Sequence, residues 1–230
     1  MVNVKSWKNF YSTSSLLGYL WILGIQNYNT KSTIWESAEQ LKQIDVNDLV
    51  VNANKYFNES GDFVFEIFNQ LIKYSICELP GIILGVGSIT DAAAASQYML
   101  SGAYFIVTPV FREDIAIVCN RRKVLWSPGC GSLTEIATAE EMRCEVVKLF
   151  PGSTYWTSFV KAIKGLQPWT SIMPTGGVSI YEANLKGWFD ARVTCVGMGS
   201  KLISKEILAN QSYVELTNNV KDTLTLIQRL

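Results

Sequence analysis

The chain has 230 residues, no histidine, and equal numbers of acidic and basic residues, so its formal net charge is zero. A neutral chain with a pI of about 6.3 has no electrostatic footprint for nucleic acid or an anionic membrane, and we predict neither as a partner. Without histidine, Ser-His-Asp and Cys-His catalytic groups and histidine-ligated metal sites are excluded. Proton transfer must then use carboxylates, lysine, tyrosine, cysteine or bound water.

Composition is typical of one large α/β domain, with 48% hydrophobic and 17% charged residues. Barrels of this class commonly form single domains of about 200–250 residues. The five cysteines are scattered and include no C-x-x-C pair, which indicates reduced, mostly buried thiols in a cytoplasmic protein. We therefore predict a single domain over residues 1–230 that needs no metal and no other cofactor.

The N-terminal quarter has the least regular pattern. The apolar stretch 16–25 resembles a signal peptide weakly, but it lacks a cleavage site and is too short to span a bilayer. It predicts a buried strand at 19–25, followed by a helix at 32–44. A second strand at 48–57 and a second helix at 61–75 complete the predictions for this part.

From about residue 80, apolar runs recur at intervals of roughly twenty residues, and each ends in glycine, proline or serine. Near-continuous apolar strands that alternate with helices predict a parallel sheet covered on both faces. The six runs are "GIILGVGS" (81–88), "AYFIVTPV" (103–110), "KVLWSPG" (123–129), "CEVVKLFPG" (144–152), "TSIMPTGGV" (170–178) and "VTCVGMGS" (193–200).

Amphipathic stretches lie between these runs and predict helices, with a closing helix at 218–230. Several begin at a good N-cap residue: Thr90 or Asp91, Ser132 or Thr134, and Ser179. Six strand–helix units, with room for two more upstream, predict a (β/α)8 TIM barrel. A doubly wound open sheet is the alternative.

Lys148 stands in the middle of an apolar run, near the end of the predicted strand. If it points into the barrel, burial disfavours its charged form and lowers its pKa toward about 7 or 8. A neutral amine there can condense with a ketone to form a Schiff base. The alternative is a lysine that turns outward or pairs with a carboxylate such as Glu135.

Two glycine-rich loops follow the last two predicted strands. "PTGGV" (174–178) ends one strand, and "GMGSKLI" (197–203) ends the next, where we expect a helix to follow. Barrels commonly bind phosphate between these two loops, through bare backbone N–H groups and a helix N-terminus. The candidate phosphate ligands are Gly176, Gly177, Gly199 and Ser200.

These segments together resemble the 2-keto-3-deoxy-6-phosphogluconate / 4-hydroxy-2-oxoglutarate aldolase family, from about Gly61 to the C-terminus. "GVGSITDAAAASQYMLSGAYFIVTPV", "WSPGCGSLTEI", "EVVKLFPGS", "MPTGGVS" and "CVGMGS" carry the resemblance in that order. The resemblance implies that Lys148 forms the Schiff base and that Ser88 helps to hold the pyruvate carboxylate. It also implies a pocket lined by Pro109 and Phe150, and a phosphate end made by Thr175, Gly176, Gly177, Gly197, Gly199 and Ser200.

The resemblance further implies a metal-independent class I aldolase, usually a homotrimer. Its substrate would be a small 2-keto acid, 2-keto-3-deoxy-6-phosphogluconate or 4-hydroxy-2-oxoglutarate. Cleavage would release pyruvate together with glyceraldehyde 3-phosphate or glyoxylate. No cofactor and no membrane are implied.

The first part of the chain departs from the family. Residues 1–55 show no match, and an ungapped extension puts Tyr56 and Ser60 where the family has a glutamate proton shuttle and a substrate-binding arginine. Tyrosine, with an ordinary pKa of about 10, is a poor substitute for that glutamate. We therefore expect weak or absent aldolase activity. A catalytically silent barrel that binds a phosphorylated sugar acid, or another phosphate-binding barrel enzyme, is the alternative.

Overall fold

The computed structural model describes residues 10–14, 20–25, 83–204, 206–207, 210 and 212–230. The helices predicted at 32–44 and 61–75 and the strand predicted at 48–57 lie outside the described residues. Tyr56 and Ser60 lie outside them too.

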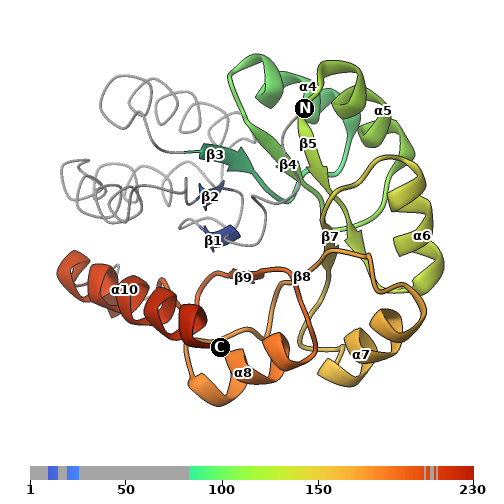
Figure 1. The fold of residues 1–230 in the computed structure, drawn as a ribbon. Helices are drawn as coiled ribbons and strands as arrows, with labels where there is room; N and C mark the ends of the chain where they lie inside the picture. The colour runs from blue at the N-terminus through green and yellow to red at the C-terminus, as the bar shows by residue number, and fades with distance from the viewer. Residues whose placement is uncertain (1–9, 15–19, 26–82, 205, 208–209, 211) are drawn as a thin grey trace.

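Every apolar run predicted after residue 80 contains a strand, and the helices follow in alternation (Figure 1). The strands are shorter than the runs, because each strand covers only part of its apolar run and the glycine, proline or serine that ends the run lies beyond it or at its last position. The described strands are β1 (Phe10–Ser14), β2 (Leu20–Ile25), β3 (Ile83–Val86), β4 (Phe105–Val107), β5 (Leu125–Ser127), β6 (Gly129–Cys130), β7 (Val147–Leu149), β8 (Ile172–Pro174) and β9 (Val196–Met198).

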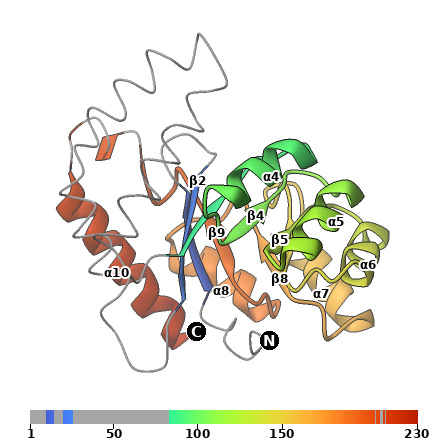
Figure 2. The same ribbon diagram turned by 90° about the horizontal axis from the view of Figure 1, so that it is seen from above.

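The helices α4 to α8 lie outside the strands, and α10 packs against α8 on the side of β1 and β2 (Figures 1 and 2). This is an α/β arrangement in which helices cover the outer face of the parallel strands. The described helices are α4 (Ala92–Leu100), α5 (Glu113–Arg122), α6 (Leu133–Glu141), α7 (Thr157–Leu166), α8 (Glu182–Asp190) and α10 (Tyr213–Arg229).

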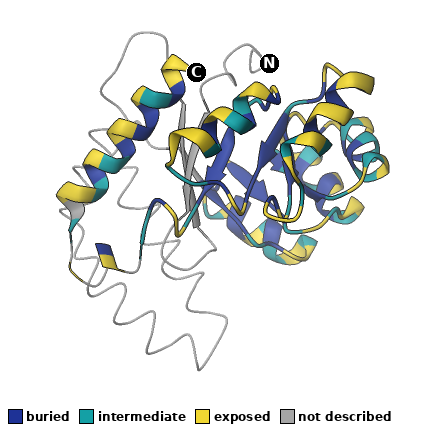
Figure 3. Cartoon of the chain, turned by 90° about the horizontal axis from the view of Figure 1, so that it is seen from below, coloured by how far each residue is buried: buried dark blue, intermediate teal, exposed yellow. Residues whose placement is uncertain are grey.

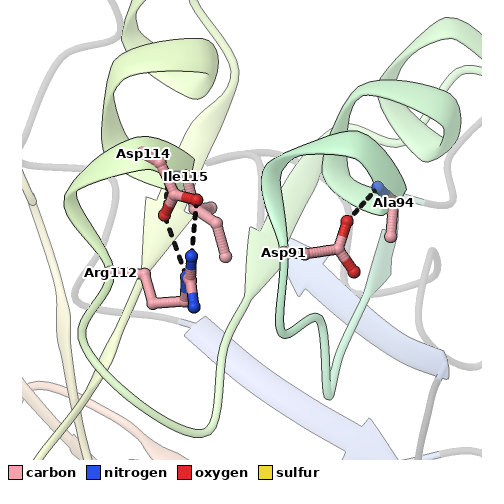
Figure 4. A network of polar contacts seen from close by, with 5 residues as sticks. All are labelled: Asp91, Ala94, Arg112, Asp114 and Ile115. Atoms are coloured by element: carbon pink, nitrogen blue, oxygen red, sulfur yellow. Dashed lines mark hydrogen bonds and ion pairs between the residues drawn. The ribbon is translucent and has the colours of Figure 1, made fainter.

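Two of the predicted helix starts are confirmed. Asp91 caps α4 by accepting a hydrogen bond of 2.8 Å from the backbone N–H of Ala94 (Figure 4). Ser132 caps α6 in the same way. The prediction for Ser179 is wrong: the N-cap of α8 is Tyr181, two residues later, and the N–H of Ser179 donates instead to the side chain of Asn184.

The strands form two hydrogen-bonded sheets, in the orders β5-β4-β3-β2-β1-β9 and β6-β7-β8. Pro128 separates β5 from β6, and the chain changes partner there: β5 pairs with β4, whereas β6 pairs with β7. Proline has no N–H to donate to a ladder, so it marks this change. On the other side, a parallel bridge between Thr175 and Gly197 links β8 to β9.

The N-terminal strands depart from the all-parallel prediction. The strand expected at 19–25 is present as β2, but it runs antiparallel to both β1 and β3. β1, which the sequence did not indicate, pairs in parallel with β9. A hairpin therefore stands between β3 and β9, where the barrel prediction placed two parallel strands and their helices.

The parallel strands are buried along most of their length (Figure 3), and their side chains divide into two clusters. Residues at alternate positions pack against the helices, among them Ile106, Val147, Leu149, Ile172 and Val196. The positions between them form a separate inner cluster, made by Phe105, Val107, Val146, Met173 and Cys195 with Leu125. Strand alternation thus produces an inner face and an outer face.

Candidate functional site

Lys148 lies on the inner face. It is the middle residue of β7, between the outward-packed Val147 and Leu149, and its neighbours across the ladder are Gly129 and Met173. Only 3% of its surface is exposed. Its Nζ lies 4.2 Å from the centroid of the Phe150 ring, which indicates that the side chain runs along β7 toward the C-terminal end of the strand.

Burial lowers the pKa of Lys148 from 10.5 to about 8, because the apolar surroundings disfavour the ammonium form. The carboxylate of Glu135 accepts hydrogen bonds of 2.9 Å from the N–H of Gly131 and from the hydroxyl of Ser132. These bonds, with that of Gly131 first, hold the pKa of Glu135 below its ordinary value. Glu135 therefore serves the start of α6, as the reciprocal partner in a capping box.

Pro109 and Phe150 lie at the ends of strands beside Lys148. Phe150 is half-buried, and its N–H donates to the carbonyl of Cys130, one step beyond β7. The carbonyl of Pro109 approaches Gly129 so closely that a Cβ there would lie 2.1 Å from it. Both predicted pocket residues therefore lie next to the ladder that carries the amine.

The loop after β8 brings the predicted Thr175, Gly176 and Gly177 together. Both glycines are exposed and have positive φ angles, of 82° and 77°, which side chains rarely adopt. The hydroxyl of Thr175 is buried and has no hydrogen-bond partner among the described residues. The N–H of Gly152, in the loop after β7, donates to the carbonyl of Thr175 at 2.7 Å.

The loop after β9 begins at the same end. Gly197 is bridged to Thr175, and the carbonyl of Gly199 accepts from the N–H groups of Leu202 and Ile203. Residues 199–203 form a turn, and the described helix α10 begins at Tyr213. Gly199 and Ser200 thus follow a strand as predicted; a turn comes directly after them, and residues 206–207 beyond it are helical.

Ser88 lies two residues beyond β3 and is half-buried, with a φ of 59°. The next residue, Ile89, donates its N–H to the carbonyl of Val107 at the end of β4. Ser88 therefore lies at the same end of the strands as the other predicted residues.

Sequence reasoning missed Tyr155, in the loop after β7. A Cβ added to Gly131 would lie 2.1 Å from the Tyr155 hydroxyl oxygen, so this hydroxyl lies directly against the end of β6. No motif marks such a contact, because it depends on how the loop folds back. The only sequence feature that could have drawn attention to Tyr155 is its position, seven residues after Lys148.

No group of three or more Cys, Asp or Glu side chains in the described part of the chain could hold a metal ion. No helix within the described ranges has the length and apolar character required to cross a membrane.

Comparisons with known proteins agree with this arrangement. A family model described as KDPG and KHG aldolase matches residues 63–219. A 2-dehydro-3-deoxy-phosphogluconate aldolase of Treponema pallidum is 30% identical over 154 residues, which cover 65% of this chain and 71% of the relative. A 2-dehydro-3-deoxy-6-phosphogalactonate aldolase of Escherichia coli is 30% identical over 121 residues, 52% of this chain and 58% of the relative's length.

Solved structures show the same fold. The KDPG aldolase of Legionella pneumophila, with pyruvate captured as a covalent carbinolamine, superposes with a TM-score of 0.59 at 22% identity, over 70% of this chain and 75% of that one. The family match spans most of the chain and includes every strand that carries a predicted site residue. The chain therefore belongs to the KDPG and KHG aldolase family.

Proposed function

We propose that the protein is a class I aldolase in which Lys148 forms a Schiff base with a 2-keto acid. The observation that carries the proposal is a buried amine on the inner face of the strands, with a pKa lowered to about 8 by its apolar surroundings. At neutral pH such an amine is uncharged in an appreciable fraction of molecules, whereas an exposed lysine is almost wholly protonated. This makes Lys148 a competent nucleophile without a metal.

The reaction follows from the chemistry of the amine. Nζ of Lys148 adds to the C2 carbonyl of the substrate, and loss of water gives an iminium. A base removes the proton of the C4 hydroxyl and the C3–C4 bond breaks, so that C4 leaves as the carbonyl carbon of the aldehyde product. The electron pair of that bond moves into the iminium to form the enamine of pyruvate. Protonation at C3 and hydrolysis then release pyruvate and restore the free amine.

The surrounding loops fit the two ends of such a substrate. The proposed phosphate end comprises Thr175, Gly176, Gly177 and the loop from Gly197 to Ser200, where positive-φ glycines leave backbone groups exposed. Ser88, Pro109 and Phe150 would line the pyruvate half. The substrates we propose are 2-keto-3-deoxy-6-phosphogluconate and 4-hydroxy-2-oxoglutarate.

The proposal includes a single barrel domain over residues 1–230. It is supported by the continuous chain between β5 and β6 and by the bridge between β8 and β9, which connect the two sheets at both sides. The expected loss of activity from Tyr56 and Ser60 stays part of the proposal. The homotrimer and the cytoplasmic location stay predictions.

Borohydride trapping tests the proposal. Reduction in the presence of pyruvate should attach a stable adduct to the peptide that holds Lys148, with a yield that increases as pH rises toward the pKa of about 8. Lys164 is the matched control: it is also buried and its pKa is also lowered by burial, but its Nζ donates to the carbonyl of Thr170, before β8 begins.

The adduct should therefore vanish in Lys148→Met and persist in Lys164→Met. Labelling of Lys164, or no labelling at all, would contradict the aldolase proposal. Binding of a phosphorylated sugar acid without any adduct would favour the catalytically silent barrel instead.

A further inference from the structure

We infer that the hydroxyl of Tyr155 binds the aldehyde half of the substrate, at the oxygen that becomes the C4 hydroxyl of the aldol. This inference rests on the proposed function, because it assigns a residue to the aldehyde half of the reaction. Schiff-base formation with pyruvate alone does not involve that half. The observations that carry it are the register of β6 and β7, the path of the loop that follows β7, and the contact between Tyr155 and Gly131.

The register places the Tyr155 hydroxyl level with the amine. Gly129 is paired with Lys148, and the N–H of Phe150 bonds to the carbonyl of Cys130, which places Gly131 beside Phe150. The Nζ of Lys148 lies over the Phe150 ring, at that same level. Since the Tyr155 hydroxyl lies against Gly131, it flanks the end of the strands where the amine emerges.

The loop of residues 151–156 crosses over β7 and contacts the strand ends on both sides. Toward β8, a Cβ added to Gly177 would lie 2.8 Å from the Cα of Ser153, and Gly152 bonds to Thr175. Toward β6, the loop ends in the contact between Tyr155 and Gly131. The loop thus lines one side of the site, from the proposed phosphate end at β8 to the end of β6. The Tyr155 hydroxyl is a polar group at the β6 end of the loop.

The environment of this hydroxyl suits a ligand oxygen. Among the residues that the structure describes, the Tyr155 hydroxyl makes no hydrogen bond, although the side chain is half-buried. Its ring packs on the ring of Phe159, with centroids 4.9 Å apart, which supports the ring from one side. Phenylalanine would fill the same space without the oxygen. The hydroxyl of tyrosine can in addition donate a hydrogen bond to a carbonyl oxygen of a ligand.

The space left by Gly131 supports the same conclusion. Any side chain there would displace the Tyr155 hydroxyl, since the added Cβ would also lie 2.9 Å from the carbon that bears the oxygen. The absence of a side chain at Gly131 therefore leaves room for the Tyr155 hydroxyl at the end of β6, the strand that pairs with β7 and Lys148.

Tyr155→Phe tests the inference, because it removes the oxygen and leaves the ring packing in place. The matched control is Tyr181→Phe: Tyr181 also precedes a helix, but it is 72% exposed. Two half-reactions are measured, borohydride trapping with pyruvate alone and aldol addition of pyruvate to glyoxylate or glyceraldehyde 3-phosphate. The first needs only the amine, and the second also needs the aldehyde.

Tyr155→Phe should leave trapping at Lys148 within about twofold of wild type and lower kcat/KM for the aldehyde by about fivefold to tenfold, the usual effect of one lost hydrogen bond. Gly131→Ala, which displaces the hydroxyl, should impair the same half-reaction, and Tyr181→Phe neither. Equal aldehyde kinetics in Tyr155→Phe and wild type, with trapping intact, would overturn this inference alone. Trapping without any aldol addition in wild type would overturn it too, and absent trapping would overturn it together with the proposed function.

Discussion

At the scale of the residue, Lys148 combines reactivity with a cost in stability. An unfolded chain carries this amine at a pKa near 10.5, whereas burial lowers the pKa to about 8 in the fold. Below pH 8 both states bind the proton, and the folded protein bears the full penalty of a buried ammonium. Between pH 8 and 10.5 the unfolded chain binds more protons, so the free energy of unfolding rises with pH there.

Lys148→Met should therefore stabilise the protein at neutral pH. The lowered pKa corresponds to a gain of about 3 kcal/mol at most, since each pKa unit is worth about 1.4 kcal/mol. Urea unfolding of both proteins at pH 7 and at about pH 10 checks the prediction. The difference should be largest at pH 7 and narrow at the higher pH; a variant that is less stable at pH 7 would contradict it.

The candidate site residues that sequence alone could predict are those of a type that is unusual in their segment of the chain. A lysine in an apolar run and paired glycines after strands depart from the local pattern, and Lys148 and the glycines of 176–177 were predicted in this way. Ser179 was misassigned as a cap because the helix begins after Tyr181, while the N–H of Ser179 donates to the side chain of Asn184 within the helix. Tyr155 has no such mark, because its place against Gly131 depends on the three-dimensional path of a loop.

At the scale of the element, the helix starts show which polar contacts stabilise. The Asp91 carboxylate satisfies a backbone N–H of α4 that has no partner within the helix, whereas Arg112 and Asp114 form an exposed ion pair at the start of α5 (Figure 4). Exposed pairs gain little, since water screens them. The shorter contact, 2.7 Å between Arg112 and Asp114, is therefore the weaker contributor.

Asp91→Ala should lower the free energy of unfolding by about 1 kcal/mol, the usual effect of a lost N-cap. Asp91→Asn is the control, because asparagine caps about as well and should retain most of the stability. Arg112→Ala should have no measurable effect. Chemical denaturation of the three variants compares them, and a larger loss in Arg112→Ala than in Asp91→Ala would refute this ranking.

The strands could be predicted only where burial on both sides leaves a continuous apolar run. This holds for β3, β4, β5, β7, β8 and β9, because parallel strands with an inner and an outer layer are mostly apolar; the two-residue β6, after Pro128, was not predicted as a separate strand. It fails for β1, whose sequence FYSTS is largely polar. Strand direction is also absent from an apolar pattern, so β2 was found as a strand while its antiparallel pairing was not.

At the scale of the whole molecule, the N-terminal hairpin connects two edges that would otherwise face each other unpaired. β3 and β9 each have a described partner on one side, β4 and the bridged β8, and the hairpin supplies the other. The family match begins at residue 63, so this connection is made by a part of the chain outside the match. The family match therefore covers the parallel strands that carry the site, but not the hairpin that connects their two edges.

This arrangement predicts that residues 1–25 are required for a monodisperse fold. Deleting them removes both strands and leaves the edges of β3 and β9 open, and open edges with apolar neighbours promote aggregation. Deletion of residues 1–9 alone is the control, because it retains β1 and β2. Size-exclusion chromatography and thermal melting followed by circular dichroism should show a cooperative, defined species for the shorter deletion and aggregation or a broad, weak transition for the longer one. A longer deletion that melts as sharply as the full chain would mean that the edges of β3 and β9 need no partner from the hairpin.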